Sequence, residues 1–531
     1  MSKQKVKHLA TSLADAMNRF KARPGIDVNN HCYSWGEVAK QSEAVAKALE
    51  GRDGEYVSLF GYRSIEAYTG IFGIILAGKA YTPLNPRFPA ERNRKMLAAS
   101  RARQMVLTPE CIDGFRSVAG SAENLLVICH GGKSLFDGLD TEFPNHQFLF
   151  TDPVQDEAIV LKPLSVDPDS LKPVYLLFTS GSTGEPKGVS VNGKNLKFYL
   201  NYTLNRYGIS EFDRMSQMFD LTFDLSVHDI FLAATSGACL CVVPERSLMG
   251  PAKFIREKEL TLWFSVPAVV MFMSKMRMLK PDAFPSLRYS LFCGEALPAR
   301  SAELWQKAAS NSVIENLYGP TEATIAFTNY RWDSETSPDQ SVNGVVPIGT
   351  AFEGLETAVL KTDGSWAETG EQGELLLSGD QVTDGYFHNP ELTGEKFIRL
   401  DGQKRWYRSG DLVEEDSNGC ICYLGRMDDQ IQVRGHRVEL QEIDQALREA
   451  SGTELAISIP VPGEGGNIDS IAGYVQLTES DGLKQSILET CKKSLADYMV
   501  PSDLRFIDSF PLNSNGKIDR NELINRYQKN R

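Results

Sequence analysis

The sequence predicts an α/β protein with a large N-terminal domain of layered α/β subdomains, which ends in a small β-rich subdomain, and a small α+β C-terminal domain. Short β-branched runs alternate with helical patterns up to about residue 340, and closely spaced strands and turns follow. The 531 residues also exceed one core, since domains hold roughly 100 to 200 residues. We therefore expect a core domain over 1–424, with the β-rich part over about 340–424, and a C-terminal domain over 425–531.

The first part of the chain contains both helix-like and strand-like patterns of apolar residues. Helical spacing of apolar residues predicts a helix over 35–49, and β-branched or aromatic runs predict strands over 56–60, 105–108 and 125–129. The apolar stretch over 70–77 is shorter than the 18 residues or so that a membrane span needs and is followed by Lys79, so it predicts a buried helix.

Beyond residue 340 the predicted strands are short and closely spaced, and the last unit, from near Gly425, mixes helices with strands. Strands are expected over 357–360, 373–377, 420–424, 455–459 and 471–476, and helices over 440–450 and 483–495.

Composition limits the partners and the compartment. A net charge of −13 argues against a nucleic-acid or anionic-membrane partner, because either needs a basic face. The N-terminus lacks the apolar core of a secretory signal, and the nine cysteines lack zinc spacing or the density of a disulfide scaffold. We expect a cytoplasmic protein with reduced core thiols.

The stretch YLLFTSGSTGEPKGV (175–189) is an apolar run that ends in a small, hydroxylated loop closed by Lys187. Glycines let backbone N–H groups converge on anionic oxygens, and hydroxyls add donors, so the loop predicts phosphate binding; a plain surface turn is the alternative. Walker A spacing is absent, and Pro186 interrupts any helix that would start at the lysine. The predicted phosphate ligands are Thr179, Ser180, Gly181, Ser182, Thr183, Gly184 and Lys187.

This stretch resembles the signature of the adenylate-forming superfamily, which includes amino-acid adenylation domains, acyl-CoA synthetases and beetle luciferases. Further resemblances follow in order: NLYGPTE (316–322) to an adenine and magnesium motif, YRSGDL (407–412) to a ribose motif, GRMDDQ (425–430) to an interdomain hinge and NSNGKID (513–519) to a catalytic lysine loop. Together they cover nearly the whole chain, and they imply that the C-terminal domain is mobile.

The resemblance implies that a carboxylate attacks the α-phosphorus of ATP, that pyrophosphate leaves and that a thiol intercepts the acyl-adenylate. Such chemistry needs positioning and fixed positive charge. Lys517 is implied to bridge the carboxylate and the phosphoryl group, Glu322 to hold Mg²⁺, Thr321 to donate to the α-phosphate, Tyr318 to stack on adenine and Asp411 to accept both ribose hydroxyls. The remaining implied ATP ligands are Asn316, Gly319 and Arg426, besides the phosphate loop with Lys187, which is also implied to act in catalysis.

The segment FDLTFDLSVHD (219–229) resembles the lining of the acyl pocket in amino-acid adenylation domains, where an aspartate at the position of Asp224 binds the α-ammonium group. A simple carboxylic acid gives no reason to bury that carboxylate, since an unpaired buried charge is costly. The alternative is that Asp224 caps a helix, with Ser226 beside it. The rest of the implied lining is Leu225, His228, Ser265, Leu291, Cys293, Gly294, Leu317, Ile325 and Ala326.

This lining is mostly apolar and carries no fixed charge beyond Asp224, so a small or medium neutral amino acid is expected. The segments 219–231 and 262–267 are most similar to stand-alone ligases that load proline onto a carrier protein in nonribosomal peptide pathways. Proline is the first choice, with alanine, serine and other neutral residues open. His228 departs from the aromatic or aliphatic residue that the family often has there.

No carrier motif is found and the chain ends eleven residues after Arg520, so we expect the thiol of a separate phosphopantetheinyl carrier protein acting in trans. Such carriers are usually acidic, and docking would use basic residues such as Arg434, Arg437, Lys492 or Lys493. Two alternatives remain: an acyl or aryl acid:CoA ligase, and a non-catalytic amino-acid or nucleotide sensor, which would have no need to retain Lys187, Glu322, Asp411 and Lys517 together.

If Asp428 is a hinge, different substitutions should affect the two half-reactions, adenylate formation and thiol transfer, separately. Lys517→Ala should abolish adenylate formation, because the bridging charge is lost, while Asp428→Pro should spare that step and block thiol transfer, because the backbone can no longer turn. Pyrophosphate exchange and thioester formation measure the two steps; equal loss of both in the Asp428 variant contradicts the division.

Overall fold

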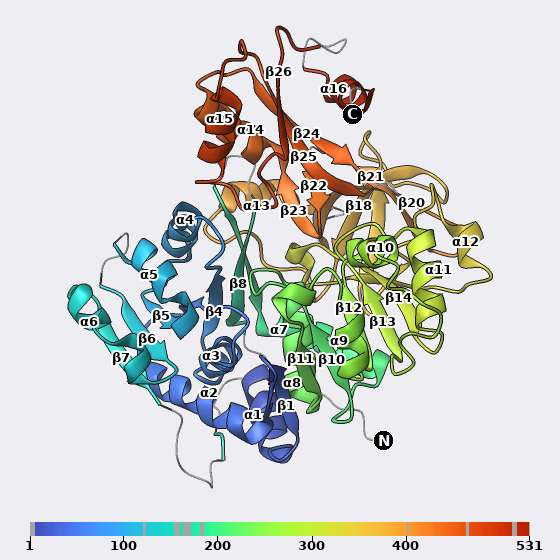
Figure 1. The fold of residues 1–531 in the computed structure, drawn as a ribbon. Coiled ribbons are helices and arrows are strands. Elements are labelled where there is room, and N and C mark those ends of the chain that lie inside the picture. The colour runs from blue at the N-terminus through green and yellow to red at the C-terminus, as the bar shows by residue number, and fades with distance from the viewer. Residues whose placement is uncertain are drawn as a thin grey trace.

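The computed structural model describes residues 6–120, 124–152, 160–162, 171–180, 185–400, 402, 404–428, 430–463, 467–511 and 518–529. Figure 1 shows a large body and a smaller lobe above it, the lobe formed by the C-terminal, orange to red part of the chain. This agrees with the predicted class of a large N-terminal α/β domain and a small C-terminal one. Two mainly parallel sheets build most of the body.

The first sheet has seven described strands, parallel except for β9. Their order is β7 (Gln147–Thr151), β6 (Leu126–His130), β5 (Gln104–Leu107), β3 (Tyr56–Phe60), β4 (Ala80–Leu84), β8 (Pro173–Thr179) and β9 (Lys187–Asn192). The helices of this part of the chain are α1 (Leu9–Arg19), α2 (Trp35–Leu49), α3 (Ile65–Leu76), α4 (Ala90–Ser100), α5 (Ile112–Ala119) and α6 (Leu139–Glu142).

The second sheet has nine described strands and is parallel at its centre. Their order is β16 (Thr350–Ala351), β15 (Thr328–Arg331), β14 (Val313–Tyr318), β13 (Tyr289–Phe292), β12 (Leu262–Ser265), β10 (Arg214–Gln217), β11 (Cys239–Val242), β1 (Pro24–Val28) and β2 (His31–Ser34). The accompanying helices are α7 (Gly193–Tyr207), α8 (Leu225–Ser236), α9 (Ala252–Glu257), α10 (Pro267–Lys275), α11 (Ala299–Ala308) and α12 (Ser337–Gln340).

A third, antiparallel sheet forms the predicted β-rich part, and a fourth sheet forms the lobe. The third contains β17 (Glu356–Leu360), β18 (Gln372–Ser378), β20 (Lys404–Glu415), β19 (Phe397–Leu400) and β21 (Ile421–Arg426), with helix α13 (Pro390–Lys396). The fourth contains β23 (His436–Glu439), β22 (Gln430–Val433), β25 (Ile468–Val475), β24 (Ala456–Pro462) and β26 (Asp503–Phe506), with α14 (Leu440–Ser451), α15 (Leu483–Cys491) and α16 (Arg520–Lys529).

Local sequence explains where the main helices begin. Ser34 and Glu37 form a reciprocal capping box that starts α2, and Asn192 with Asn195 does the same for α7. Helix α3 is apolar around its whole circumference and is buried at every position except Glu66, as predicted for the stretch over 70–77. In the described part of the chain, no helix combines the length and apolarity required to span a bilayer.

Two of the predicted boundaries that differ from the structure lie at α15 and β21. Helix α15 ends at Cys491 rather than at residue 495, because three turn residues, Lys492 to Ser494, follow it. Strand β21 continues through Gly425 to Arg426, since it pairs with β20 up to Asp411, so the expected division at 424/425 falls inside a strand and stays a prediction.

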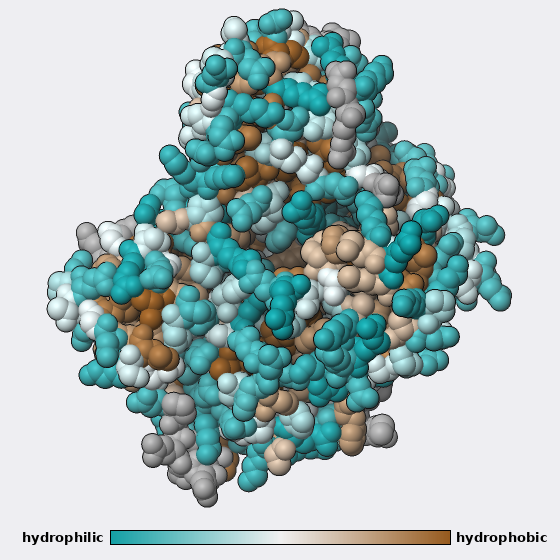
Figure 2. Space-filling view, in the orientation of Figure 1, coloured by the Kyte–Doolittle hydropathy of each residue, from teal (hydrophilic) through white to brown (hydrophobic). Residues whose placement is uncertain are grey.

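The lobe has its own apolar core, and it meets the body through both apolar and polar contacts, since Phe88 of the body packs against that core. Arg92 of α4 and Glu442 of α14 form a buried ion pair at 2.6 Å, with side chains 7% and 8% exposed. Figure 2 shows polar side chains over most of the face drawn, and the surface is hollowed where lobe and body meet. The junction between lobe and body is therefore a candidate place for a ligand.

Gly349 gives a test of the packing against β15 at the edge of the second sheet. It has φ +78°, and a Cβ there would lie 2.0 Å from the Asn329 carbonyl oxygen, so Gly349→Ala should lower the free energy of unfolding by roughly 3 kcal/mol. Gly364 has φ +83° with nothing within 4 Å, so Gly364→Ala should cost only about 1 kcal/mol. Urea denaturation measures both; equal losses would contradict the steric argument.

Candidate functional site

Several chain segments converge at the junction between body and lobe. Strand β8 ends at Thr179, β14 ends at Tyr318, and helix α8 begins directly after Asp224. The carboxyl ends of strands in open α/β sheets are where ligands bind, because the connecting loops there leave a crevice. The lobe closes the crevice with the hairpin formed by β22 and β23.

The described part of the predicted phosphate loop faces this hairpin. Thr179 pairs with Lys187 across β8 and β9, so the two strands bring the lysine back to the end of β8. Lys187 Nζ lies 2.8 Å from Glu439 Oε1 on β23, and Ser180 Oγ donates to the Arg437 carbonyl at 2.9 Å. The other predicted phosphate ligands lie outside the described residues: Gly181, Ser182, Thr183 and Gly184.

A cavity of about 100 Å³ lies beside the end of β14, between body and lobe. Tyr318 donates to Asp411 Oδ2 at 2.5 Å, and Arg426 Nη1 donates to Asp411 Oδ1 at 2.8 Å, so both carboxylate oxygens have partners. The Asn316 amide donates to the Val346 and Pro347 carbonyls. The predicted ATP ligands that line this cavity are Asn316, Tyr318, Gly319, Asp411 and Arg426.

Glu322, the predicted metal ligand, is buried in a short 3₁₀ turn after β14. Burial disfavours its ionisation, but the Arg437 guanidinium at 2.9 Å and the Tyr386 hydroxyl at 2.7 Å outweigh it and hold its pKa below the ordinary value. An ionised carboxylate suits Mg²⁺, and a cationic group already occupies the place. The described residues contain no cluster of three or more His, Cys, Asp or Glu suited to a metal.

The turn after Glu322 has a strained backbone. Thr324 and Ile325 are consecutive β-branched residues with φ of +61° and +72°, a conformation that costs about 1–3 kcal/mol per residue. The buried Gln381 amide holds it by donating to the carbonyls of Ala323, Thr324 and Ala326. The strain is therefore supported from outside the motif, as expected where a loop is shaped for a ligand.

Asp224 stands at the N-cap of α8, yet its side chain makes no capping hydrogen bond, which removes the alternative of a plain cap. It is 4% exposed, and its Oδ2 has no partner among the described residues. Burial raises its pKa to about 7, although the Thr321 hydroxyl and the backbone N–H groups of Ile325 and Leu225 work against this. The site thus contains an unneutralised carboxylate suited to a cation.

The other predicted pocket residues are neutral, and most of them are buried. His228 Nδ1 lies 2.6 Å from the Tyr199 hydroxyl, and burial lowers the pKa of His228 to about 3, so it carries no charge at neutral pH. Apart from Gly294, these residues are at most 2% exposed: Leu225, His228, Ser265, Leu291, Cys293, Leu317, Ile325 and Ala326. These residues add no charged side chain to that of Asp224.

The predicted hinge residue lies at the end of the third sheet. Asp428 binds Arg426 through both carboxylate oxygens, at 2.9 and 2.6 Å, and accepts the Gln430 N–H at 3.2 Å. Its role as a hinge stays a prediction. Lys517, the predicted catalytic lysine, lies outside the described residues.

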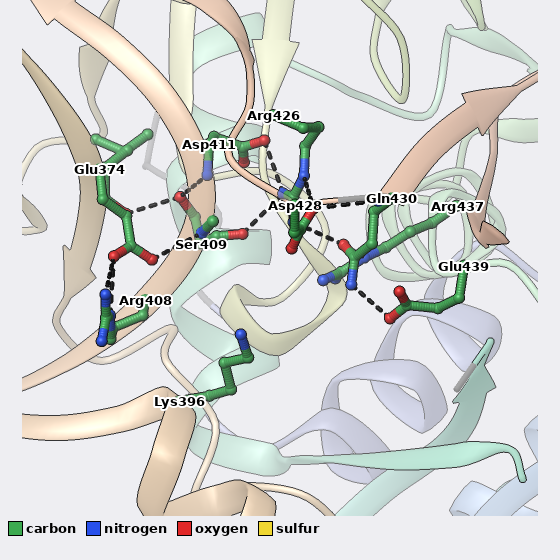
Figure 3. A network of polar contacts seen from close by, with 12 residues as sticks. Glu374, Lys396, Arg408, Ser409, Asp411, Arg426, Asp428, Gln430, Arg437 and Glu439 are labelled. Carbon is green, nitrogen blue, oxygen red and sulfur yellow. Dashed lines mark hydrogen bonds and ion pairs between the residues drawn. The ribbon is translucent and has the colours of Figure 1, made fainter. Parts of the chain in front are cut away.

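Five contributors to the site were not predicted: Gln381, Tyr386, Glu295, Gln430 and Glu439. Glu295 Oε1 accepts the Gly435 N–H at the hairpin tip at 2.6 Å. Figure 3 shows Gln430 at the centre of a polar network, where it accepts from Arg426 and Arg437 and donates to Glu439. For Glu439 a sequence signal was available: in the segment HRVE (436–439) the charged residues Arg437 and Glu439 alternate, and alternate residues of a strand lie on the same face.

The expectation for carrier docking needs one correction. Arg437 is 19% exposed and is engaged by Glu322, so it is not a surface residue for an acidic partner. Arg434, Lys492 and Lys493 are exposed and remain candidates.

Comparison with known protein families gives two matches. A family model described as AMP-binding enzyme matches residues 13–387, and one described as AMP-binding enzyme C-terminal domain matches residues 442–517.

Individual relatives match over nearly the whole chain. The L-proline--[L-prolyl-carrier protein] ligase of Pseudomonas fluorescens is 31% identical, over 91% of this chain and 92% of the relative. The D-alanine--D-alanyl carrier protein ligase of Bacillus cytotoxicus is 27% identical, over 92% and 94%. The crystal structure of the Vibrio cholerae adenylation domain AlmE with glycyl-adenosine-5'-phosphate superposes with a TM-score of 0.90 at 32% identity, over 98% and 97% of the two chains.

The buried carboxylate predicts an unusual dependence of stability on pH. The pKa of Asp224 is higher in the folded protein, about 7, than its ordinary 3.8, so its cost to folding is absent below about pH 4 and complete above about pH 7. Asp224→Asn should therefore be more stable than wild type by about 4 kcal/mol at about pH 8, with no difference near pH 4. Urea unfolding at both pH values tests this; a constant difference would show that Asp224 is not the titrating group.

Proposed function

The chain belongs to the family of AMP-binding enzymes, and on that premise we propose that it activates a small neutral amino acid as its aminoacyl-adenylate and transfers the aminoacyl group to a carrier-protein thiol. The acceptor is the phosphopantetheine of a separate carrier acting in trans. Carrier-protein ligases among the relatives support this acceptor over coenzyme A.

The observation that carries the proposal is the unneutralised Asp224 carboxylate. Its Oδ2 lacks a partner inside a buried pocket, and an α-ammonium group would supply the missing charge and hydrogen bond. A carboxylic acid without an amino group would leave the cost of this buried charge in place. The same argument opposes a non-catalytic sensor of nucleotides alone.

The pocket favours the smallest neutral side chains. Its lining residues are almost fully buried, and the neutral His228 offers no charge to an acidic substrate side chain. The relatives act on L-proline and D-alanine according to their names, and the superposed adenylation domain holds a glycyl-adenylate. Proline remains the first candidate, followed by glycine and alanine.

In the adenylation step, Asp224 would hold the ammonium group so that the substrate carboxylate points toward Thr321 and the end of β8. Lys187 and the phosphate loop would bind the triphosphate, and Lys517 would stabilise the charge that moves onto the phosphoryl oxygens. Glu322 would hold Mg²⁺, which supplies additional positive charge at the departing phosphates. Asp411 would bind the ribose hydroxyls once Tyr318 and Arg426 yield one oxygen.

Amino-acid-dependent exchange of labelled pyrophosphate into ATP tests the proposal. Exchange should occur with one small neutral amino acid, first proline, then glycine or alanine, tested as both enantiomers where these exist. Asp224→Asn should lower kcat/KM for that amino acid by about 100-fold or more, because the ammonium group loses its buried counter-charge.

Matched acids that lack the amino group serve as the control, for example cyclopentanecarboxylate for proline and propionate for alanine. Exchange with these acids alone would overturn the amino-acid assignment and favour the acyl-CoA ligase alternative.

A further inference from the structure

One turn of the chain, residues 321–326 after β14, touches both the substrate pocket and the nucleotide cavity. Thr321 and Asp224 line the same cavity of about 40 Å³, and the Ile325 N–H forms a hydrogen bond with the Asp224 carboxylate. On its other side the turn packs closely on Gly319, which lines the nucleotide cavity, because a Cβ there would lie 2.6 Å from the backbone of the turn. The shape of this backbone therefore determines which groups reach Asp224.

The turn does not take this shape by local preference. Thr324 and Ile325 have φ of +61° and +72°, which β-branched residues disfavour because the side chain crowds the backbone. The Gln381 amide donates to the carbonyls of Ala323, Thr324 and Ala326 at 3.1, 3.2 and 2.7 Å. The Thr324 hydroxyl donates back to the Gln381 carbonyl at 2.6 Å. One side chain thus orients three carbonyls of the strained turn.

The contact with the Thr324 carbonyl has a direct consequence for Asp224. The Thr324 carbonyl and the Ile325 N–H belong to the same peptide unit, and in a trans peptide these two groups point in opposite directions. A hydrogen bond that draws the carbonyl toward Gln381 therefore turns the N–H away from Gln381. On that side the N–H meets the Asp224 carboxylate.

Gln381 is itself held from outside the turn. Its side chain is fully buried, and the carbonyls of its neighbours Asp380 and Val382 accept hydrogen bonds from the Asn195 amide at 2.7 and 3.3 Å. Asn195 lies in the first turn of α7, where it also forms the capping box. Helix α7 thereby fixes the position from which Gln381 reaches the turn.

We propose that Gln381 is a positioning residue that sets the affinity for the amino acid, because it directs the Ile325 N–H to the Asp224 carboxylate. This deepens the proposed function and rests on it. The hydrogen bond orients the carboxylate and favours its charged form, which is the form that binds an ammonium group. The alternative is an amide that only satisfies three buried carbonyls, which would contribute to stability and leave substrate binding unchanged.

Gln381→Met tests the proposal, because methionine has a similar length but no donor for the carbonyls. In pyrophosphate exchange, KM for the amino acid should rise about 10-fold, as expected for the loss of one hydrogen bond to a charged group. KM for ATP should change less than about 2-fold, because Tyr318 and Arg426 keep their hydrogen bonds to Asp411.

Thr324→Val is a milder variant of the same contact. It removes only the hydroxyl that donates back to Gln381 and keeps the β-branched shape, so KM for the amino acid should rise about 3-fold. If Gln381→Met fails to fold, an unchanged KM in Thr324→Val would overturn the inference.

A double-mutant cycle with Asp224→Ala separates positioning from general stability. If Gln381 acts through Asp224, adding Gln381→Met to Asp224→Ala should lower kcat/KM for the amino acid less than about 2-fold. A further loss of about 10-fold in that background would show that Gln381 acts independently of Asp224, and the inference would be wrong.

Gln104→Met is the matched control. Gln104 is also a buried glutamine whose amide donates to a backbone carbonyl, that of Asp53. It is the first residue of β5, at the amino-terminal ends of the parallel strands and so opposite to the site. Gln104→Met should lower the free energy of unfolding in urea and leave both KM values as in wild type. An equal rise of KM for the amino acid in Gln104→Met and Gln381→Met would contradict the positioning role.

The failure of the inference differs from the failure of the proposed function. If the wild type exchanges pyrophosphate with no amino acid, the proposed function is wrong. If it does exchange, and KM for the amino acid in Gln381→Met is unchanged or rises together with KM for ATP, the function stands and only the positioning role is refuted.

Discussion

Two ion pairs across the junction between body and lobe, Lys187 with Glu439 and Arg437 with Glu322, determine how the active-site region is arranged. A buried charge without a partner costs several kcal/mol. If the lobe moves away, Lys187 and Glu322 therefore each need another partner of opposite charge. The candidate partners are the nucleotide phosphates for Lys187 and the metal ion for Glu322. The arrangement of the lobe is in this way tied to what occupies the site.

Asp224 is the exception to this pairing. Its carboxylate is buried without a counter-charge, and the cost appears as a pKa raised to about 7. The strained turn at Thr324 and Ile325 lies beside it, supported by Gln381. Proteins keep such unfavourable features where a bound ligand offsets their cost. The buried carboxylate therefore favours binding of a cationic group in this pocket.

Much of the fold could be predicted because its signals are local. The helix over Trp35–Leu49 and the strand over Tyr56–Phe60 match their predicted bounds, since a capping box starts the helix and an apolar run defines the strand. The end of α15 was placed too late, because apolar periodicity continues past the turn that stops the helix. Motif residues of the site could be proposed for the same local reason: each lies in a short string with its own pattern.

The sequence by itself determined the fold class, the family and the set of candidate nucleotide ligands, because loop chemistry, strand periodicity and ordered motifs are written in neighbouring residues. Only the tertiary structure decided which charges meet. Glu439 and Lys187 are far apart in the chain, and no local pattern states that they pair at 2.8 Å. Burial, which raises the pKa of Asp224 and neutralises His228, is likewise a property of packing between elements.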